Sequence, residues 1–235
     1  MPMNPATCDP STPRTMKRLR GLEFFRDAPA SVRWEIGRAI LFMFFRTFHR
    51  VAHYGCENIP ASGPVLLVAN HVSYYDPMLV GMGSRRRVRF MTWDAVFRVP
   101  LLGWLVRQYG AFPVKPEKAG KSSLSEALAT LKRGEALGIF PEGGRSFDGQ
   151  IARVKPGAAW LAVRARATIV PATVVGMFDV WPRQHLLPRL RGRIVVKYHP
   201  PIVLDEATCA AHEDDKAFQA ELMARVMDVV RSGLR

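Results

Sequence analysis

The chain has 235 residues, 48% of them hydrophobic and 10% aromatic, which supplies one large core and excludes a wholly disordered protein. The formal net charge of +14 predicts an anionic partner, but charge alone does not choose among a nucleic acid, an acidic membrane and a phosphorylated substrate. The three cysteines, Cys8, Cys56 and Cys209, are too far apart in the sequence to suggest a metal-ligand pair. We therefore expect reduced thiols in a cytoplasmic protein and no metal site.

Residues 1–31 predict a mobile basic arm. Prolines stand at positions 2, 5, 10 and 13, and the cations that accompany them are Arg14, Lys17, Arg18 and Arg20. The first 20 residues mix Pro, Thr and Arg without an apolar stretch, so we expect no secretory signal in them.

Residues 32–54 predict an amphipathic helix. At about 100° per residue, one broad arc collects large apolar side chains, namely Trp34, Ile36, Ile40, Leu41, Phe44, Phe48 and Val51. The opposite side carries Arg38, Arg46, His49 and Arg50, with Phe42 among them. The longest uncharged apolar run, residues 39–45, is far shorter than the roughly 20 residues that span a bilayer. The pattern is typical of a helix lying in the interface of an anionic membrane, and the alternative is a helix docked on the protein core.

The pattern from residue 55 to residue 235 indicates one α/β domain. Apolar runs predict strands and amphipathic stretches predict helices. The expected strands are residues 64–70, 88–92, 135–140, 167–176 and 192–199, and the expected helices cover residues 122–134, residues 155–165 and the segment from about Asp214 onward. Strands that alternate with helices predict a mostly parallel central sheet covered by helices on both faces.

The stretch "ANHVSYYDP", residues 69–77, places a histidine five positions before an aspartate. On one continuous helix or strand, His71 and Asp76 would point away from each other. A turn between a strand and a helix would bring them together.

Pro77 favours such a turn. Proline disfavours a helical conformation at Asp76 and suits the first helical position, so we expect Asp76 to cap a helix that starts at Pro77. Residues 71–75 would then double back, and Asp76 could orient His71 as a general base. The plainer interpretation is a helix cap beside an unrelated histidine.

Two further stretches place polar groups at the ends of predicted strands. "GIFPEGGRS", residues 138–146, ends a strand in a turn whose glycines let backbone N–H groups approach a ligand, and Arg145 can bind phosphate through its forked guanidinium. "YGAFPVKP" carries Lys115 after a short apolar segment. Each stretch alone also fits a plain surface turn. Together they follow successive predicted strands, which is where open parallel sheets bind their ligands.

In this order the blocks resemble those of the glycerolipid acyltransferase family, which includes the 1-acylglycerol-3-phosphate acyltransferases. The N-H-x4-D block of the family matches Asn70, His71 and Asp76, and its F-P-E-G-x-R-S block matches residues 140–146. Weaker matches are "GAFPVK", an apolar segment that ends in a basic residue, and "TIVPA", an apolar strand with a proline. The resemblance covers roughly residues 55–200.

The resemblance implies that His71 deprotonates an acceptor hydroxyl and that Asp76 orients it, with Asn70 and Ser73 as candidate supports. It also implies a set of acceptor-binding residues, whose cations take a phosphate: Lys115, Glu142, Gly143, Gly144, Arg145 and Ser146. The acyl donor would be acyl-CoA or acyl carrier protein, and no cofactor is implied. The family usually has arginine at the position of Lys115. Because lysine cannot make the same bidentate contact with a phosphate, this position does not decide which head group the acceptor carries.

We therefore expect a peripheral membrane O-acyltransferase on the cytoplasmic face of the cell membrane, with 1-acyl-sn-glycerol 3-phosphate as acceptor and phosphatidate as product. The basic arm and the amphipathic helix would hold it on an anionic membrane surface. One alternative is an acyltransferase for a lyso-ornithine lipid or another lysophospholipid. A distant alternative is a nucleic-acid-binding protein, suggested by the net charge and by "SRRRVR" at residues 84–89, but it leaves the His71 and Arg145 blocks unexplained.

Overall fold

The computed structural model describes residues 32–98, 103, 106–107, 111–114, 121–151 and 153–235, so the predicted arm lies outside the described residues. The strands are β1 (Arg50–Tyr54), β2 (Val65–Ala69), β3 (Val88–Trp93), β4 (Phe112–Val114), β5 (Ala136–Ile139), β6 (Thr168–Val175) and β7 (Arg193–Tyr198). The α-helices are α2 (Val32–Phe48), α3 (Asp76–Met82), α5 (Lys121–Lys132), α6 (Gly157–Ala165), α7 (Met177–Val180), α8 (Glu206–Ala211) and α9 (Lys216–Ser232). Two short 3-10 helices are η2 (Cys56–Asn58) and η3 (Asp94–Arg98).

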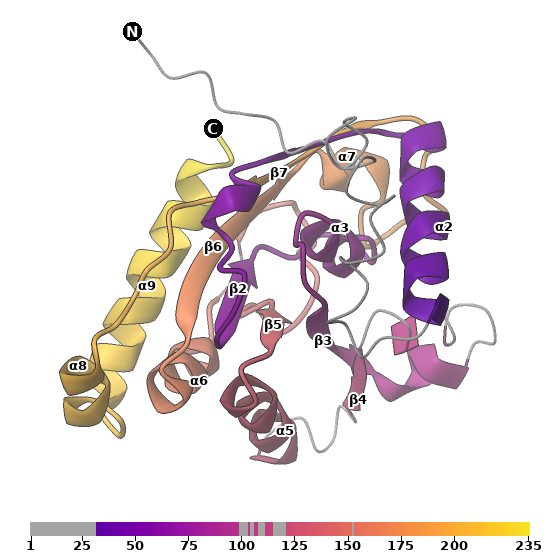
Figure 1. Cartoon of the computed structure of the whole chain (residues 1–235). Helices are drawn as coiled ribbons and strands as arrows, with labels where there is room; N and C mark the ends of the chain where they lie inside the picture. Colours follow the sequence, from indigo (N-terminus) through magenta and orange to yellow (C-terminus); the bar gives the residue numbers. More distant parts are fainter. Residues whose placement is uncertain (1–31, 99–102, 104–105, 108–110, 115–120, 152) are drawn as a thin grey trace, which may run out of the picture.

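Within the described residues, seven strands form one sheet in the order β1-β7-β6-β2-β5-β3-β4. From β6 to β4 every neighbouring pair is parallel, whereas β7 runs antiparallel to β6, and β1 lies parallel to β7. Figure 1 shows the sheet with helices packed around it. The mostly parallel α/β architecture predicted from the sequence is confirmed.

The central strands are buried on both faces, which explains why they read as unbroken apolar runs. Every residue of β2 and of β5 is buried. Side chains of β2 alternate between two buried clusters, with Val65, Leu67 and Ala69 in one and Leu66 and Val68 in the other. Helices α2 and α3 contribute to the first cluster, and helices α5, α6 and α9 cover the second.

The helix predicted for residues 32–54 is too long, because the observed helix ends at Phe48 and residues 50–54 form the strand β1. The N–H of Arg50 donates to the carbonyl of Gly192 at 2.8 Å, and β1 then continues in register with β7. Backbone pairing at the open edge of the sheet therefore overrides the helical period after Phe48. Such long-range pairing leaves no mark in the local sequence pattern.

Helix α2 docks on the protein core and also presents apolar side chains outward. Leu41 and Phe45 are buried in the cluster that α2 shares with β2 and α3, whereas Met43 is 66% exposed and Phe48 is 37% exposed. Figure 1 shows α2 standing at one end of the fold beside α3. In the part of the chain that the structure describes, no helix has the length and apolar character needed to cross a membrane.

The topology brings the two strongest sequence blocks to one edge of the sheet. Because β2 and β5 are adjacent and parallel, their carboxyl ends meet. Residues 70–76 follow β2 directly, and residues 140–146 follow β5 directly. Strand β6 lies on the other side of β2 and also ends at this edge, which is where parallel sheets place their ligands.

Candidate active site

The turn after β2 folds as the sequence suggested, with a shift of one residue at its end. Helix α3 begins at Asp76, one residue before the predicted start at Pro77, and proline at the second helical position costs no hydrogen bond because that N–H has no helical partner. The capping position falls on Tyr75, whose side chain makes no capping bond. The carboxylate of Asp76 therefore bonds to the turn that precedes the helix.

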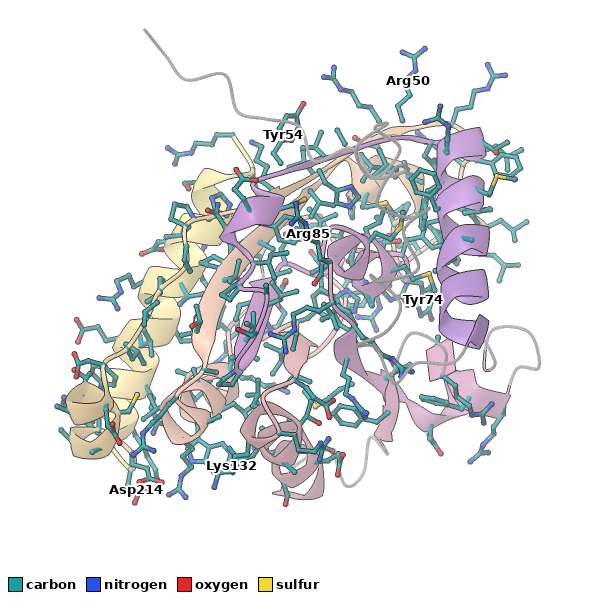
Figure 2. The ribbon with its side chains drawn as sticks, in the orientation of Figure 1. Arg50, Tyr54, Tyr74, Arg85, Lys132 and Asp214 are labelled. Atoms are coloured by element: carbon teal, nitrogen blue, oxygen red, sulfur yellow. The ribbon has the colours of Figure 1, made fainter. Side chains whose placement is uncertain are left out.

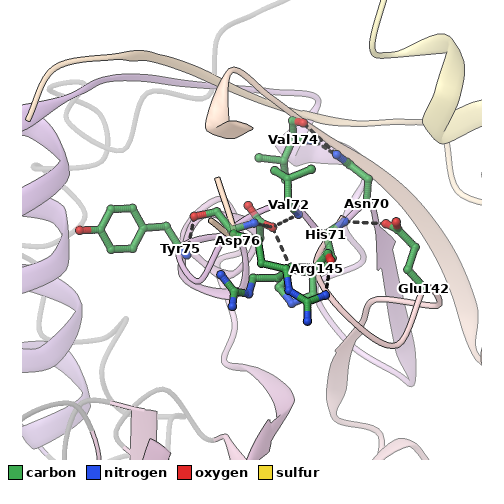
Figure 3. A network of polar contacts seen from close by, with 10 residues as sticks. Asn70, His71, Val72, Tyr75, Asp76, Glu142, Arg145 and Val174 are labelled. Atoms are coloured by element: carbon green, nitrogen blue, oxygen red, sulfur yellow. Dashed lines mark hydrogen bonds and ion pairs between the residues drawn. The ribbon is translucent and has the colours of Figure 1, made fainter. Parts of the chain in front are cut away.

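Asp76 holds the histidine of that turn. The distance from Nδ1 of His71 to Oδ2 of Asp76 is 2.9 Å, and the same oxygen accepts the backbone N–H groups of Val72 and Ser73, each at 2.7 Å. Figure 3 shows these bonds converging on one carboxylate. Because a carboxylate only accepts hydrogen bonds, Nδ1 carries the proton and Nε2 is left as the basic nitrogen of the ring.

The pair combines a buried carboxylate with a partly accessible ring. The side chain of Asp76 is 0% exposed and that of His71 is 18% exposed. The ring of His71 stacks on Phe140, the first residue after β5, with 4.2 Å between centroids and 18° between planes. The imidazole is thus fixed on one side by the carboxylate and on one face by an aromatic ring, as a positioned base requires.

The "FPEGGRS" block supports the backbone of His71. Its N–H donates to Oε1 of Glu142 at 2.8 Å, and its carbonyl accepts the N–H of Ser146 at 2.8 Å. Glu142 and Ser146 are both buried, and the hydroxyl of Ser146 donates to Asp148 at 3.0 Å. The structure therefore places these two predicted acceptor-binding residues against the histidine turn, where they fix its position.

Asn70 and Ser73 are buried parts of the same turn. Asn70 bridges from the end of β2 to β6, because its Nδ2 donates to the carbonyl of Val174 at 3.0 Å and its Oδ1 accepts the N–H of Val174 at 2.8 Å. Ser73 is fully buried, and its hydroxyl accepts the N–H of Tyr75 at 3.4 Å. Both residues hold the backbone on either side of His71.

The glycine turn brings a lysine that the sequence reading missed. Gly143 has φ +73°, a conformation that favours glycine, and a Cβ at this position would lie 2.8 Å from Nζ of Lys155. Gly144 has open space around its Cα, so a ligand can approach the backbone there. Lys155 is anchored to the same turn, since its N–H donates to the carbonyl of Pro141 at 2.9 Å.

Arg145 lies over an aromatic ring of the histidine turn. Its guanidinium carbon is 3.5 Å from the ring centroid of Tyr74, and its Nη1 is buried without a hydrogen-bond acceptor among the described residues. Burial lowers the pKa of Arg145, and the positive charge of Arg183 lowers it further, whereas Tyr74 and Asp76 raise it. An arginine remains charged under these conditions, so the group is a cation with a free donor beside the His71 pair.

Residues after β6 complete the surroundings, and no local motif pointed to them. The ring of Trp181 packs against Tyr74 at 5.3 Å and Tyr75 at 4.7 Å. Nη1 of Arg183 donates to the carbonyl of Arg145 at 3.2 Å. The available signal was topological, because this segment follows the third strand that ends at the same edge.

Lys115 lies outside the described residues, so its part in the site stays a prediction. It follows β4, which ends at Val114 and pairs in parallel with β3.

Comparison with known proteins places this site in a family context. Residues 50–175 match a protein-family model described as Acyltransferase. Over 170 residues the chain is 29% identical to a chloroplastic 1-acyl-sn-glycerol-3-phosphate acyltransferase of Arabidopsis thaliana. The matched region covers 71% of this chain and 47% of that protein. Over 124 residues it is 32% identical to the 1-acyl-sn-glycerol-3-phosphate acyltransferase of Bacillus subtilis, and this match covers 52% of this chain and 61% of that protein. The chain thus spans about half the length of the first of these curated relatives.

A solved structure shares the fold. The crystal structure of the 1-acyl-sn-glycerophosphate acyltransferase of Thermotoga maritima matches with a TM-score of 0.69 and 23% identity, covering 93% of this chain and 88% of that one. The family model matches more than half of the chain, and the two blocks quoted for the resemblance meet at one edge of the sheet. The chain therefore belongs to the acyltransferase family that includes the 1-acyl-sn-glycerol-3-phosphate acyltransferases.

Proposed function

We propose that the chain transfers a fatty acyl group from an acyl thioester to the hydroxyl of a lysophospholipid. The proposed acceptor is 1-acyl-sn-glycerol 3-phosphate and the proposed product is phosphatidate, as the names of the relatives suggest. The observation that carries the proposal is the bond from His71 to the buried carboxylate of Asp76 beside a free arginine donor. That arrangement suits deprotonation of a hydroxyl on a phosphate-bearing molecule.

The chemistry follows from the protonation of the ring. Nε2 of His71 takes the proton of the acceptor hydroxyl while the oxygen attacks the thioester carbonyl. Asp76 then stabilises the imidazolium, which returns its proton to the departing thiol of coenzyme A or acyl carrier protein. Only a proton and an acyl group move, so the proposed reaction needs no metal or redox cofactor.

Acceptor binding is proposed for the cations and glycines around the "FPEGGRS" turn. Arg145 would bind the acceptor phosphate through its free donor, with Lys115 as a second cation, while Gly143 and Gly144 would leave room for the ligand at the backbone. We add Lys155, which lies over Gly143. Glu142 and Ser146 would act through the backbone of the histidine turn.

Membrane attachment is proposed on the cytoplasmic face of the cell membrane. The outward apolar side chains of α2, Met43 and Phe48, lie near the exposed cations Arg46 and Arg50. This combination suits the interface of an anionic bilayer, with the basic arm adding electrostatic attraction.

The direct test is product analysis with the purified chain. One labelled acyl group is supplied on coenzyme A and, separately, on acyl carrier protein, together with lysophosphatidate, other lysophospholipids and a lyso-ornithine lipid. We expect the unmodified chain and the His212→Ala variant to form phosphatidate. The His71→Ala variant should form none. Acylation of another acceptor without phosphatidate would overturn the acceptor assignment, and equal activity of His71→Ala would overturn the mechanism.

A further inference from the structure

The segment between α7 and β7 exposes an unusual amount of apolar surface. In this segment, residues 181–192, Leu186 is 89% exposed, Leu187 is 75% exposed and Leu190 is 64% exposed. A single exposed leucine is common on protein surfaces, but three within five residues concentrate apolar area in one place. We call residues 181–192 the leucine loop.

The leucine loop is also cationic. The loop contains three arginines and no acidic residue, namely Arg183, Arg189 and Arg191, and Arg193 follows it at the start of β7. All four are exposed. Between residues 203 and 235, by contrast, acidic residues outnumber basic ones. The chain therefore gathers positive charge around the leucines and not around α8 and α9.

Hydrogen bonds at its base hold the loop in place. Nε1 of Trp181 donates to the carbonyl of His185 at 3.0 Å, and the N–H of His185 donates to the carbonyl of Pro182 at 3.1 Å. The N–H of Arg189 donates to the carbonyl of Val180 at 2.9 Å. Because these bonds fix the base, Leu186 and Leu187 are presented outward by a structured loop, and Leu190 follows directly after the bonded Arg189.

The loop is tied to the candidate active site. Arg183 donates to the carbonyl of Arg145, and its guanidinium lies 4.0 Å from the ring centroid of Phe147. Gln184 also donates to the carbonyl of Phe147, whose ring is 63% exposed. The first residues of the leucine loop and this exposed phenylalanine therefore border the turn that carries the phosphate-binding candidate.

The loop is also connected to the strand after α2 and, through one aromatic ring, to α2 itself. The N–H of Arg50 donates to the carbonyl of Gly192, the last residue of the loop, and Figure 2 shows Arg50 pointing away from the body of the molecule. Tyr75 links Trp181 to Phe44, with centroid distances of 4.7 Å and 5.7 Å. One aromatic cluster thus joins the helix, the histidine turn and the loop.

We propose that the leucine loop is a second membrane-contact element, separate from α2 and the basic arm. Leu186, Leu187 and Leu190 enter the acyl region of an anionic bilayer, and Arg189 and Arg191 contact its phosphate groups. This inference rests on the proposed function, because a lipid acceptor leaving the bilayer at the loop would reach the histidine turn without crossing bulk water.

Vesicle binding by the full chain tests the loop without relying on catalysis. We compare the unmodified chain with Leu186→Ser/Leu187→Ser/Leu190→Ser on phosphatidylcholine vesicles with and without phosphatidylglycerol. The triple variant should partition about tenfold or more weakly on both kinds of vesicle, because it loses apolar insertion. Arg189→Gln/Arg191→Gln should weaken binding only to the anionic vesicles, roughly fivefold for each arginine.

The matched control is Val203→Ser, compared with Leu190→Ser alone. Val203 is 69% exposed and adjoins the bridge between Ile169 and Ile202, so it lies near the amino end of β6, away from the candidate site. We expect Leu190→Ser to weaken partition and Val203→Ser to leave it unchanged. Equal effects of the two changes, or unchanged binding of the triple variant, would overturn the proposal.

An activity measurement separates this proposal from the proposed function. The triple variant should lose acyl transfer to a long-chain lysophosphatidate held in vesicles and keep full activity on a short-chain, water-soluble acceptor. Equal loss on both acceptors would overturn a membrane role for the loop. If the unmodified chain acylates no acceptor but the triple variant still fails to bind vesicles, the proposed function fails and the loop assignment stands.

Discussion

Within the described residues, two histidine–aspartate pairs have the same geometry and different surroundings. Nδ1 of His71 lies 2.9 Å from Asp76, and Nδ1 of His212 lies 2.9 Å from Asp215. Each imidazole also stacks on a phenylalanine ring, at 4.2 Å and 4.1 Å between centroids. The second pair is therefore an internal control for the first.

The two carboxylates do different work. The Asp76 side chain is 0% exposed, and among the described residues its hydrogen bonds all go to the turn that carries His71. The Asp215 side chain is 40% exposed and caps α9 through the N–H groups of Ala217 and Phe218. The Phe218 N–H, followed by His212, holds the pKa of Asp215 below its usual value. Asp215 is primarily a helix cap, and its bond to His212 is secondary to that role.

The surroundings of the two rings differ in charge as well. Arg145 lies near His71 with a free donor, while His212 is followed directly by the acidic residues Glu213 and Asp214. An anionic acceptor is attracted to the first site and repelled from the second. A histidine–carboxylate pair is therefore a candidate base only where the orienting carboxylate is buried and a cation with a free donor lies beside the ring.

The largest expected effect is the loss of the proposed base. His71→Ala should lower kcat/KM for acyl transfer by about 10²- to 10⁴-fold, the usual contribution of a positioned base, while His212→Ala should change it less than about twofold. Release of free thiol from acyl-CoA measures the rate, and circular dichroism checks folding. Comparable losses in both variants would remove the distinction between the pairs.

Asp76→Asn should reduce the same rate by about 10²-fold or more, because an amide no longer fixes the Nδ1–H tautomer or stabilises the imidazolium. Asp215→Asn is the matched change at the surface pair and should leave the rate unaltered. Full activity of Asp76→Asn would show that the buried carboxylate is structural only.

Arg145→Ala should raise KM for the phosphorylated acceptor by about tenfold or more, since a hydrogen bond between charged groups contributes roughly 1.5–3 kcal/mol. KM for the acyl donor should stay the same. Arg225→Ala, an exposed position on α9, is the matched control. An unchanged acceptor KM would remove phosphate recognition from Arg145 and weaken the charge argument that separates the two pairs.

One buried and one partly buried histidine should make stability depend on pH. Burial lowers the pKa of His49 below 6.5, and burial followed by Lys197 lowers that of His199. The unfolded chain therefore takes up protons near pH 6.5 that the folded chain does not, so the free energy of unfolding should fall as the pH drops through this range. Urea denaturation at pH 7.5 and 5.5 measures the slope.

Replacement of His49 distinguishes a buried histidine from the surface one. His49→Gln should flatten this pH dependence, whereas His212→Gln should preserve the slope that comes from the buried groups. If His49→Gln kept the full slope, the protonation of this side chain would have no part in the acid sensitivity.

The smallest expected effect is at the helix cap. Asp215→Ala should lower the free energy of unfolding by about 1 kcal/mol, the usual cost of a lost N-cap, with no change in acyl transfer. Asp214→Ala loses only an exposed ion pair with Arg164 and should cost less. A rate loss in Asp215→Ala would contradict a purely structural role for the second pair.

Much of this arrangement followed from local sequence. Apolar runs predicted the central strands, because burial on both faces of β2 and β5 requires continuous apolar residues. Amphipathic stretches predicted α5, α6 and α9, whereas the short helices α7 and α8 were not predicted. The five-residue spacing and Pro77 predicted the turn that joins His71 to Asp76. The resemblance to a known family added the residues around Arg145.

Other features required the assembled sheet. The strand β1 was predicted as helix because its apolar residues fit a helical period, and only pairing with β7 decides its conformation. The buried face of α9 also depends on its packing partners, which leave Phe218 and Val229 only partly buried.

The sequence by itself determined the chemistry that is available: a histidine and an aspartate in one turn, a glycine-rich turn with an arginine, and an excess of positive charge. Only the tertiary structure decided which groups meet, because Glu142, Arg145, Lys155 and the leucine loop reach the site from segments that are distant in sequence from the histidine turn. It also decided which of two similar histidine–aspartate pairs is buried. Burial and long-range strand order arise from the whole sheet, and a local pattern carries no record of them.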